Sequence, residues 1–367
     1  MTMRAQRSIF ITGATGLLGR EVLRRLLGAD PRLRVYALVR DPRALVADSQ
    51  IVPLTGDLRA DALGLAPSDR AAVQRDVSAI IHLAADTTFS APLERARAVN
   101  TFGTERVLEL ASDCALPIHV AYVSTAFVAG RRTGLIAEDA IETTSWVNAY
   151  EQSKHEAEAL VREHASNWVI LRPSTVVCDD SNGRITQVNA VHRALRLYHE
   201  GLAAMMPGVV ESSVDVVTTS YVADAIARLA LREDAAGRTV HLCAGAGALG
   251  LDELLDVTYE RWARDSEWRR RRIARPVVCD LETYALFERS VEDVGDASLR
   301  RLTRALSHFV PQLALPILFE TTNAEVLLGC AAPPVRDFWL FMIDHLIATH
   351  SMARVPRPAS RDPQRAA

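Results

Sequence analysis

The sequence predicts an α/β fold, with a doubly wound parallel sheet followed by a smaller, mostly helical part. Over about the first 175 residues, short apolar runs alternate with amphipathic helical patterns. A glycine-rich turn joins the first apolar run to the first helical pattern. Strands that are apolar throughout and alternate with helices are typical of a parallel sheet covered by helices on both faces.

Six apolar runs are expected to form the strands of this sheet. They are residues 8–12, 33–39, 51–54, 78–83, 117–123 and 168–172. Helical patterns between them include residues 17–28, 92–114 and 149–164. After Pro173 the alternation weakens, but a strand and a helix are predicted within 214–231 and a further strand at 239–243.

From Leu251 onward, helical patterns are interrupted by prolines, which end helices. We therefore expect a first domain of residues 1–175 plus about 211–245. A second, substrate-binding domain should contain about 176–210 plus 246–350. Residues 354–367 mix Pro, Arg, Ser and Ala without periodicity, so we expect a disordered tail there.

Charge and cysteine content exclude several kinds of protein. A formal net charge of −3 gives no strongly basic face, so a nucleic-acid partner is not expected. The five cysteines form no C-x-x-C pair and the histidines show no ligand spacing, so we expect neither disulfides nor a metal site. The first apolar run starts too early for a signal sequence, and no run reaches the ~18 apolar residues of a membrane span. We expect a reduced, cytoplasmic protein with no membrane span.

The turn TGATGLLG at residues 12–19 lies between the first strand and the first helix. Its glycines permit a tight turn, close approach of the backbone to a pyrophosphate and close packing of helix on strand. The free amides at the start of the helix attract the anionic diphosphate. The first domain is therefore interpreted as a dinucleotide-binding Rossmann domain, with six expected cofactor contacts: Gly13, Thr15, Gly16, Leu17, Leu18 and Gly19.

The ends of the second and third strands bear on the choice of dinucleotide. Arg40 stands where an NAD enzyme normally has an acidic residue, and an arginine suits the additional phosphate of NADP. Arg40, helped by Arg43, therefore favours NADPH, although Asp41 is adjacent and Arg40 alternatively is a solvated surface residue. In the segment GDL at 56–58, Asp57 is placed to bind the adenine amino group, with a simple turn aspartate as the alternative, and Leu58 follows it.

Tyr150 and Lys154 are four residues apart at the start of a predicted helix. This spacing places both side chains on one helical face. We expect the ammonium to lower the pKa of the tyrosine, so that Tyr150 exchanges a proton with a carbonyl or alcohol oxygen. Ser124 and Thr125 place small hydroxyls at the carboxyl end of the fifth strand, where doubly wound sheets bind ligands. Asn100 lies on the helix before that strand.

The chain resembles the extended short-chain dehydrogenase/reductase superfamily, and within it the fatty acyl-CoA reductase and thioester (carboxylic acid) reductase branch of male-sterility type. The resemblance extends over residues 8–231 and is faint beyond them, at Thr321, Thr322 and Asn323. The segments that carry it are GDL at 56–58, LGL at 63–65, IIHLAA at 80–85, VNTFGT at 99–104, VSTAFVAG at 123–130, residues 150–158, LRPS at 171–174 and residues 215–226.

The resemblance implies roles for individual residues. Thr125 would be the catalytic hydroxyl, with Ser124 as the second candidate, beside Tyr150 and Lys154. Asn100 would hold a structural or proton-relay water. Lys154 would also contact the nicotinamide ribose. Further cofactor contacts are implied for Ala84, Ala85, Pro173, Ser174, Thr175 and Val176.

The same resemblance implies NADPH-dependent reduction of an acyl thioester to an aldehyde, with further reduction to the alcohol left open. We expect the thioester to arrive already activated, on coenzyme A or a separate carrier protein, and a homodimer is compatible with the sequence. The alternative is another extended short-chain activity with the same catalytic group. A carbonyl or hydroxysteroid-type dehydrogenase and a nucleotide-sugar epimerase are the examples considered.

Other polar or aromatic features have simpler interpretations. The basic run at residues 269–275 is a candidate for binding phosphates of coenzyme A or an acidic carrier protein, but a solvated helix face is preferred. His82 is interpreted as a hydrogen-bonded core histidine. Cys178 is interpreted as a small buried residue. The aromatic residues Phe338, Trp339 and Phe341 are expected to pack in the core rather than line an acyl pocket.

Overall fold

The computed structural model describes residues 7–179, 182–209, 212–294, 297, 300 and 310–350. Its centre is a seven-stranded sheet with the strand order β12-β7-β5-β4-β1-β2-β3, in which every neighbouring pair is parallel. The strands are β1 Ser8–Thr12, β2 Arg34–Val39, β3 Ile51–Thr55, β4 Ala79–His82, β5 His119–Val123, β7 Trp168–Pro173 and β12 Arg238–Leu242. The predicted doubly wound fold is thus confirmed.

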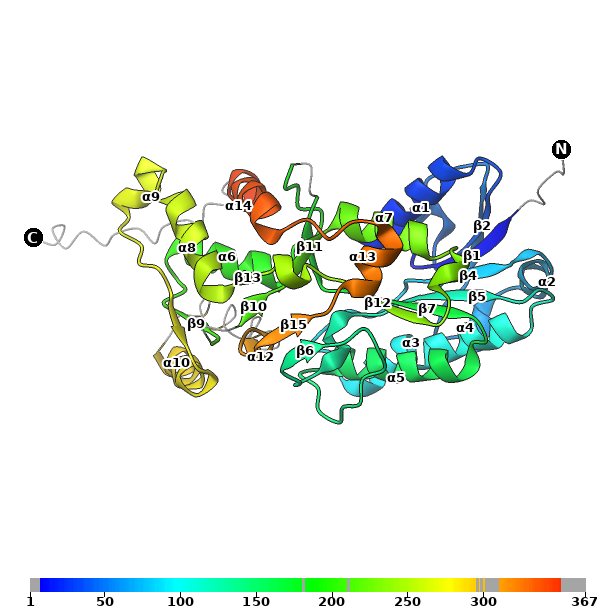
Figure 1. Ribbon diagram of the computed structural model, residues 1–367, viewed down its shortest axis with the longest axis horizontal. Helices are drawn as coiled ribbons and strands as arrows, with labels where there is room; N and C mark the ends of the chain where they lie inside the picture. Colours follow the sequence, from blue (N-terminus) through cyan, green and yellow to red (C-terminus); the bar gives the residue numbers. More distant parts are fainter. Residues whose placement is uncertain are drawn as a thin grey trace, which may run out of the picture.

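Helices cover both faces of the sheet (Figure 1). Helices α1 (Leu17–Ala29) and α7 (Thr219–Leu229) pack against each other on one face. On the other face lie α3 (Leu93–Asn100), α4 (Phe102–Ser112) and α5 (Ala149–His164). Successive residues of β1 contribute to different cores, because side chains alternate between the two faces of a strand. The strands are therefore apolar throughout.

The seven strands of the central sheet were predicted, but other parts of the chain differ from the sequence-based elements, and several short strands and one helix outside this sheet were not predicted. The single helix predicted over 92–114 is two helices that meet at Thr101. The Thr101 hydroxyl donates to the Ser153 carbonyl (3.1 Å) and to Glu156 (3.2 Å), which ties this junction to α5. Helix α2 (Pro67–Asp76), whose exposed face is rich in polar residues, was not predicted.

The remaining chain forms short strand pairs and helices at the end of the molecule opposite β2 and β3 (Figure 1). The paired strands are β6 Gly134–Ile136 with β15 Ile317–Phe319, β8 Thr175–Cys178 with β11 Val216–Thr218, β9 Met205–Pro207 with β14 Val277–Cys279, and β10 Ser213–Val214 with β13 Leu249–Gly250. The helices are α6 Ala190–Glu200, α8 Leu251–Trp262, α9 Ser266–Arg270, α10 Leu281–Val294, α12 Val310–Leu313, α13 Thr322–Leu328 and α14 Val335–His350. The expected domain boundaries stay a prediction, and residues 354–367 lie outside the described residues.

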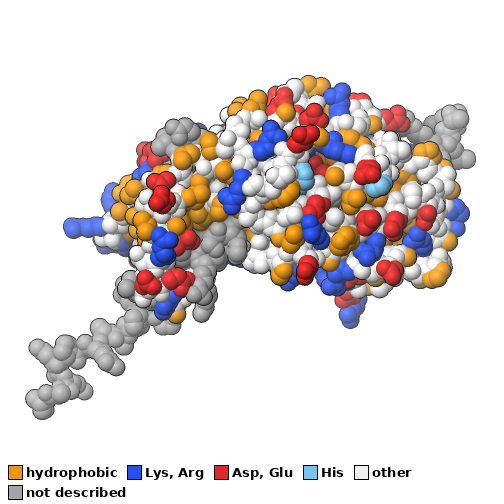
Figure 2. Space-filling model, turned by 90° about the horizontal axis from the view of Figure 1, so that it is seen from below, with side chains coloured by type: hydrophobic (Ala, Val, Ile, Leu, Met, Phe, Trp, Pro, Cys, Tyr) orange, Lys and Arg blue, Asp and Glu red, His pale blue; other side chains and the backbone are white. Residues whose placement is uncertain are grey.

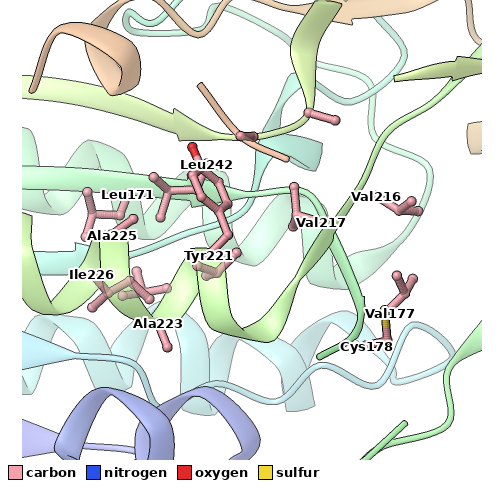
Figure 3. Packing of buried hydrophobic residues seen from close by; sticks show 14 of the residues in the cluster. Leu171, Val177, Cys178, Val216, Val217, Tyr221, Ala223, Ala225, Ile226 and Leu242 are labelled. Atoms are coloured by element: carbon pink, nitrogen blue, oxygen red, sulfur yellow. The ribbon is translucent and has the colours of Figure 1, made fainter. Parts of the chain in front are cut away.

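One apolar core joins the sheet to this second part. Figure 3 shows Leu171 of β7 and Leu242 of β12 beside Ile226 of α7. Val177 of β8 and Val217 of β11 belong to the same cluster, and all five side chains are buried. The cluster continues into α8 and α14, so the position of the second part relative to the sheet is set by shared packing.

A buried ion pair joins α5 to strand β7 of the sheet. The Arg172 side chain, fully buried in β7, donates from Nε (2.9 Å) and Nη2 (2.6 Å) to the two carboxylate oxygens of Glu158 on α5. A third nitrogen, Nη1, contacts His241 Nε2 at 3.2 Å. Burial favours the neutral acid, but the Arg172 charge and hydrogen bonds hold the pKa of Glu158 below its usual value. The pair is therefore ionic and fully desolvated.

Removing one partner of this pair should destabilise the fold strongly, because the other charge is left buried without compensation. We expect Glu158→Ala to lower the free energy of unfolding by about 3–5 kcal/mol. The double variant Glu158→Leu with Arg172→Met should lose much less, since it buries no charge. Urea denaturation of the three proteins measures this. A loss below about 1 kcal/mol for Glu158→Ala would contradict the described pairing.

Candidate active site

The turn between β1 and α1 has room for an anion and none for side chains. Gly13 has a φ of +77°, and a Cβ there would lie 2.7 Å from the Ala84 nitrogen. A Cβ on Gly19 would lie 2.0 Å from the Gly13 oxygen. Exposed Gly16 precedes α1, and no described side chain caps the helix amides there. These features fit the diphosphate of a dinucleotide.

The ends of β2 and β3 are hydrogen-bonded to each other, with the Gly56 amide 3.0 Å from the Val39 carbonyl. Arg40 is exposed at this point. Hydrogen bonds from Arg59 (3.0 and 2.7 Å) are the main cause that lowers the pKa of Asp57 to about 2, and the Arg40 charge contributes. Arg59 therefore already occupies the carboxylate predicted to bind adenine, and that role stays a prediction.

Arg43, which was expected to help Arg40, forms an ion pair with Asp41. It donates to both carboxylate oxygens of Asp41, each at 3.0 Å. Asp41 and Arg43 thus neutralise each other, whereas among the described residues Arg40 has no ion-pair partner within 4.0 Å. Leu58, the next predicted contact, is buried against Gly103 of α4, so its side chain packs in the core.

A hydrogen-bond chain connects the glycine turn to the helices on the opposite face. The Ala84 amide donates to Thr12 Oγ1 (3.2 Å), which contacts His82 Nδ1 (2.6 Å). His82 Nε2 contacts Thr104 Oγ1 (3.0 Å), and that hydroxyl donates to the Asn100 carbonyl (2.6 Å). Burial lowers the pKa of His82 to about 3, so the ring is neutral. The interpretation of His82 as a hydrogen-bonded core residue is confirmed.

The Asn100 side chain forms hydrogen bonds with both the loop after β4 and helix α5. Its Nδ2 donates to the Asp86 carbonyl (3.0 Å) and to Ser153 Oγ (2.9 Å), and its Oδ1 accepts from the Asp86 amide (2.8 Å). Half-buried Ala84 and Ala85 belong to the same loop. Both amide hydrogens are used within the protein, and the water-holding role of Asn100 stays a prediction.

Helix α5 presents Tyr150 and Lys154 on one buried face. It begins after Asn148, whose Oδ1 accepts from the Glu151 amide (3.0 Å). Tyr150 is 9% exposed and Lys154 is 2% exposed. The Tyr150 ring stacks on Phe89 of the loop after β4, with the ring centroids 5.5 Å apart. Both side chains thus lie beside the segments predicted to contact the dinucleotide.

Lys154 is held at the carboxyl end of β5. Its Nζ donates to the Val123 carbonyl (2.7 Å) and lies 4.1 Å from the ring centroid of Tyr122. Burial lowers the pKa of Lys154 to about 7, although the Glu158 charge acts in the opposite direction. At neutral pH the amine is therefore close to half-protonated.

The pKa of Tyr150 differs from the expectation based on spacing. Lys154 was expected to lower it, but burial raises the pKa of Tyr150 to about 12. A hydrogen-bonding contact with Thr125 acts downward, and the Glu151 charge acts upward. The expectation was wrong because spacing alone does not include the cost of desolvating a phenolate. At neutral pH, Tyr150 is a phenol that can donate its hydrogen.

The two hydroxyls after β5 have different neighbours. Thr125 caps the short helix η3 (Ala126–Ala129) and its Oγ1 accepts from the Phe127 amide (3.3 Å). Its contact with Tyr150 places both hydroxyls together. Ser124 Oγ is buried on the side of Glu158 and, among the described residues, has no partner within hydrogen-bond distance. The geometry favours Thr125 over Ser124 as the partner of Tyr150.

An open pocket adjoins this site. Its wall includes Phe127 and Gly130 from the segment after Thr125. The C-terminal segment that contains α12 and β15 forms much of the opposite wall and is largely apolar. That segment falls within the expected substrate-binding domain, but none of its residues was predicted individually, because only its prolines stand out in the sequence. Its lining residues are Gln312, Leu313, Leu315, Ile317 and Phe319.

The predicted contacts that follow β7 lie around this pocket. Thr175 lines it, and Val176 follows in β8. Pro173 ends β7, and buried Ser174 contacts Asp215, another residue of the pocket. Phe338 and Trp339 are buried in the main core, as expected, whereas Phe341 is 55% exposed, so the expectation of core packing was wrong for Phe341.

The basic run lies on and after α9, at the end of the molecule away from β2 (Figure 1). Arg271 donates to the carbonyls of His199 and Glu200, and Arg275 pairs with Asp252 and Asp256. On the face shown in Figure 2, basic and acidic side chains are interspersed. Only Arg269 and Arg270 of the run lie in a helix, so the interpretation of the whole run as a solvated helix face was wrong in its secondary structure.

The described part of the chain has neither a membrane-spanning helix nor a metal-binding cluster. None of its helices combines the length and apolar character needed to cross a membrane. In the same residues, no three or more His, Cys, Asp or Glu side chains form a group that could hold a metal ion.

Comparison with known proteins identifies the family. A model of an NAD-binding domain, described as male sterility protein, matches residues 11–51 and 42–226, more than half of the chain. Hybrid PKS-NRPS synthetase poxE of Penicillium oxalicum is 33% identical over 178 residues, which are 46% of this chain and 4% of that protein. Fatty acyl-CoA reductase 8 of Arabidopsis thaliana is 23% identical over 330 residues, with 66% of each chain covered.

A solved structure agrees with these sequence matches. The terminal R domain from the myxalamid PKS-NRPS biosynthetic pathway has a TM-score of 0.77 and 26% identity, covering 96% of this chain and 93% of that one. The glycine turn, the Tyr150 and Lys154 helix and these matches together show that the chain belongs to the male sterility protein family of oxidoreductases, in the thioester reductase branch of the extended short-chain dehydrogenases/reductases.

Proposed function

We propose that the protein is an NADPH-dependent reductase of acyl thioesters, which it converts to aldehydes. The observation that carries this proposal is the contact of the Tyr150 phenol with Thr125, which lies two residues before Phe127 of the pocket wall, with the buried Lys154 amine on the same helix as Tyr150. The names of the relatives support it, since they include a fatty acyl-CoA reductase and a reductase domain of a PKS-NRPS pathway. The acyl group would be carried on coenzyme A or on a separate carrier protein.

In this proposal the protein orients the thioester and stabilises negative charge on its oxygen. The bound cofactor supplies the hydride for the carbonyl carbon. Thr125 and Tyr150 donate hydrogen bonds to the carbonyl oxygen while charge develops on it, in a site largely closed to water. The phenolic proton then neutralises the oxygen and leaves a tyrosinate. Lys154, one turn further along α5, would stabilise this charge in its protonated form.

The resulting hemithioacetal collapses when its hydroxyl loses a proton and the carbon–sulfur bond breaks. The thiol leaves with a proton, and the aldehyde remains in the pocket. Tyr150 must be protonated at the start of the reaction, and its pKa of about 12 ensures this at neutral pH. The same residues would serve a second hydride transfer that reduces the aldehyde to the alcohol.

A substrate survey tests the proposed activity. NADPH oxidation should occur with acyl thioesters of coenzyme A or of an isolated carrier protein, with aldehyde and free thiol formed in equal amounts. Absorbance at the NADPH band measures oxidation of the cofactor, and a thiol reagent measures the released thiol. No turnover of any thioester, together with good turnover of ketones, alcohols or nucleotide sugars, would contradict the proposal and favour another extended short-chain activity.

Substitution Tyr150→Phe tests the role of the phenol. It removes the proton donor and keeps the ring that stacks on Phe89, so kcat should fall by about 10²–10⁴ while NADPH affinity stays unchanged. Tyr36→Phe is the matched control, because Tyr36 loses only a hydrogen bond to Asp76 (2.8 Å) at the far end of β2. Steady-state rates and NADPH titration measure both. Full activity of Tyr150→Phe would exclude the phenol from the chemistry.

Substitution Arg40→Ala tests the preference for NADPH. Loss of a charge-assisted contact with the cofactor phosphate should cost about 1.5–3 kcal/mol, which corresponds to a roughly 10- to 100-fold higher KM for NADPH. The KM for NADH should change little. Arg43→Ala is the control, because Arg43 is already paired with Asp41. Equal effects of Arg40→Ala on both cofactors would show that Arg40 does not select NADPH.

A further inference from the structure

A second buried carboxyl lies next to the proposed catalytic tyrosine. Glu151 follows Tyr150 in the first turn of α5 and is only 1% exposed. Its Oε2 accepts from the Val147 amide (2.9 Å), and its Oε1 accepts from Asn148 Nδ2 (3.1 Å). The Glu151 amide in turn donates to Asn148 Oδ1. This reciprocal capping fixes the turn that carries Tyr150.

The Glu151 carboxylate also binds the wall of the pocket. Gln312 of α12, 161 residues further along the chain, donates from Nε2 to Glu151 Oε1. Gln312 and its neighbour Leu313 line the pocket. Among the described residues, Gln312 Oε1 has no hydrogen-bond partner, so the contact with Glu151 is the polar anchor found for this side chain. One hydrogen bond thus joins the first turn of α5 to the opposite wall.

The hydrogen-bond donors around Glu151 favour the charged carboxylate, whereas burial disfavours it. Burial is the largest influence and raises the pKa of Glu151 to about 7. The Val147 amide, Gln312 and Asn148 act downward through hydrogen bonds, and Arg131 from the loop after η3 acts downward through its charge. The three groups that bind the carboxylate are all donors. Protonation would weaken these contacts, because a neutral carboxylic acid accepts hydrogen bonds less strongly than a carboxylate.

We propose that Glu151 and Gln312 are positioning residues that couple the α12 wall of the pocket to the orientation of the Tyr150 phenol. This inference rests on the proposed thioester reduction, because it assigns that pocket to the acyl group. The acyl chain that settles against α12 would hold Gln312 in place, and Glu151 would transmit this position to the turn that carries the phenol. The residues act through Tyr150 and need not touch the reacting atoms.

The pH dependence of kcat separates positioning from a structural role. In the wild type, kcat should fall as the pH drops through about 7, because protonated Glu151 accepts its hydrogen bonds less strongly. Glu151→Gln should lower kcat about 10- to 100-fold, leave the KM for NADPH unchanged and remove this acidic limb. Gln312→Leu should also lower kcat, and Glu151→Asp, which keeps the charge, should restore part of the loss. Unchanged kcat and an unchanged limb in Glu151→Gln would overturn the proposal.

Gln152→Leu is the matched control, because Gln152 is the next residue of α5 and binds Glu156 (3.1 Å) rather than α12. It should leave kcat and its pH profile unchanged. A second measurement needs no turnover. In carboxyl NMR titrations, Gln312→Leu should raise the pKa of Glu151 further, because a donor to the carboxylate is lost. An unaltered Glu151 pKa would overturn the coupling even if the enzyme reduces no thioester, and such inactivity by itself contradicts only the proposed function.

Discussion

The buried polar face of α5 is the constraint on which the rest of the structure depends. Glu151, Ser153, Lys154 and Glu158 are all nearly inaccessible, and a buried polar group without a partner costs free energy. Their partners come from separate elements, namely the backbone before α5, Asn100, the end of β5 and Arg172 of β7. A rotation or shift of α5 would break several of these contacts together. The position of Tyr150 therefore follows from polar satisfaction as much as from apolar packing.

The same burial determines the protonation states at the site. Desolvation favours neutral forms, so it raises the pKa of Tyr150 and lowers the pKa of Lys154. A neutral phenol is the form required to donate a hydrogen to a carbonyl that receives hydride. The direction of the shift therefore agrees with a reductase, in which Tyr150 begins each turnover protonated. The hydrogen bonds that run from Thr12 through His82 and Thr104 to Asn100 connect the glycine turn to α5.

Much of the sheet could be predicted from the sequence because both of its faces are buried. Continuous apolar runs mark such strands, and the glycine spacing at Gly13 and Gly19 reflects contacts where a Cβ does not fit. The pair Tyr150 and Lys154 was visible from helical spacing. The pKa of Tyr150 was not, because it depends on burial. Asp57 is similar, since its partner Arg59 is a local contact that competes with the predicted ligand. The pocket wall at Gln312 and Phe319 depends on long-range packing, for which spacing gives no signal.

The transfer of a hydride from NADPH to a thioester carbon is the central claim, and isotope labelling tests it most directly. The protein would be given NADPH that carries deuterium at the transferable position of the nicotinamide, with an unlabelled acyl thioester as substrate. The account predicts an aldehyde with one deuterium on its carbonyl carbon, identified by mass spectrometry. Unlabelled product, or oxidised cofactor without any aldehyde or alcohol formed from the thioester, would contradict it.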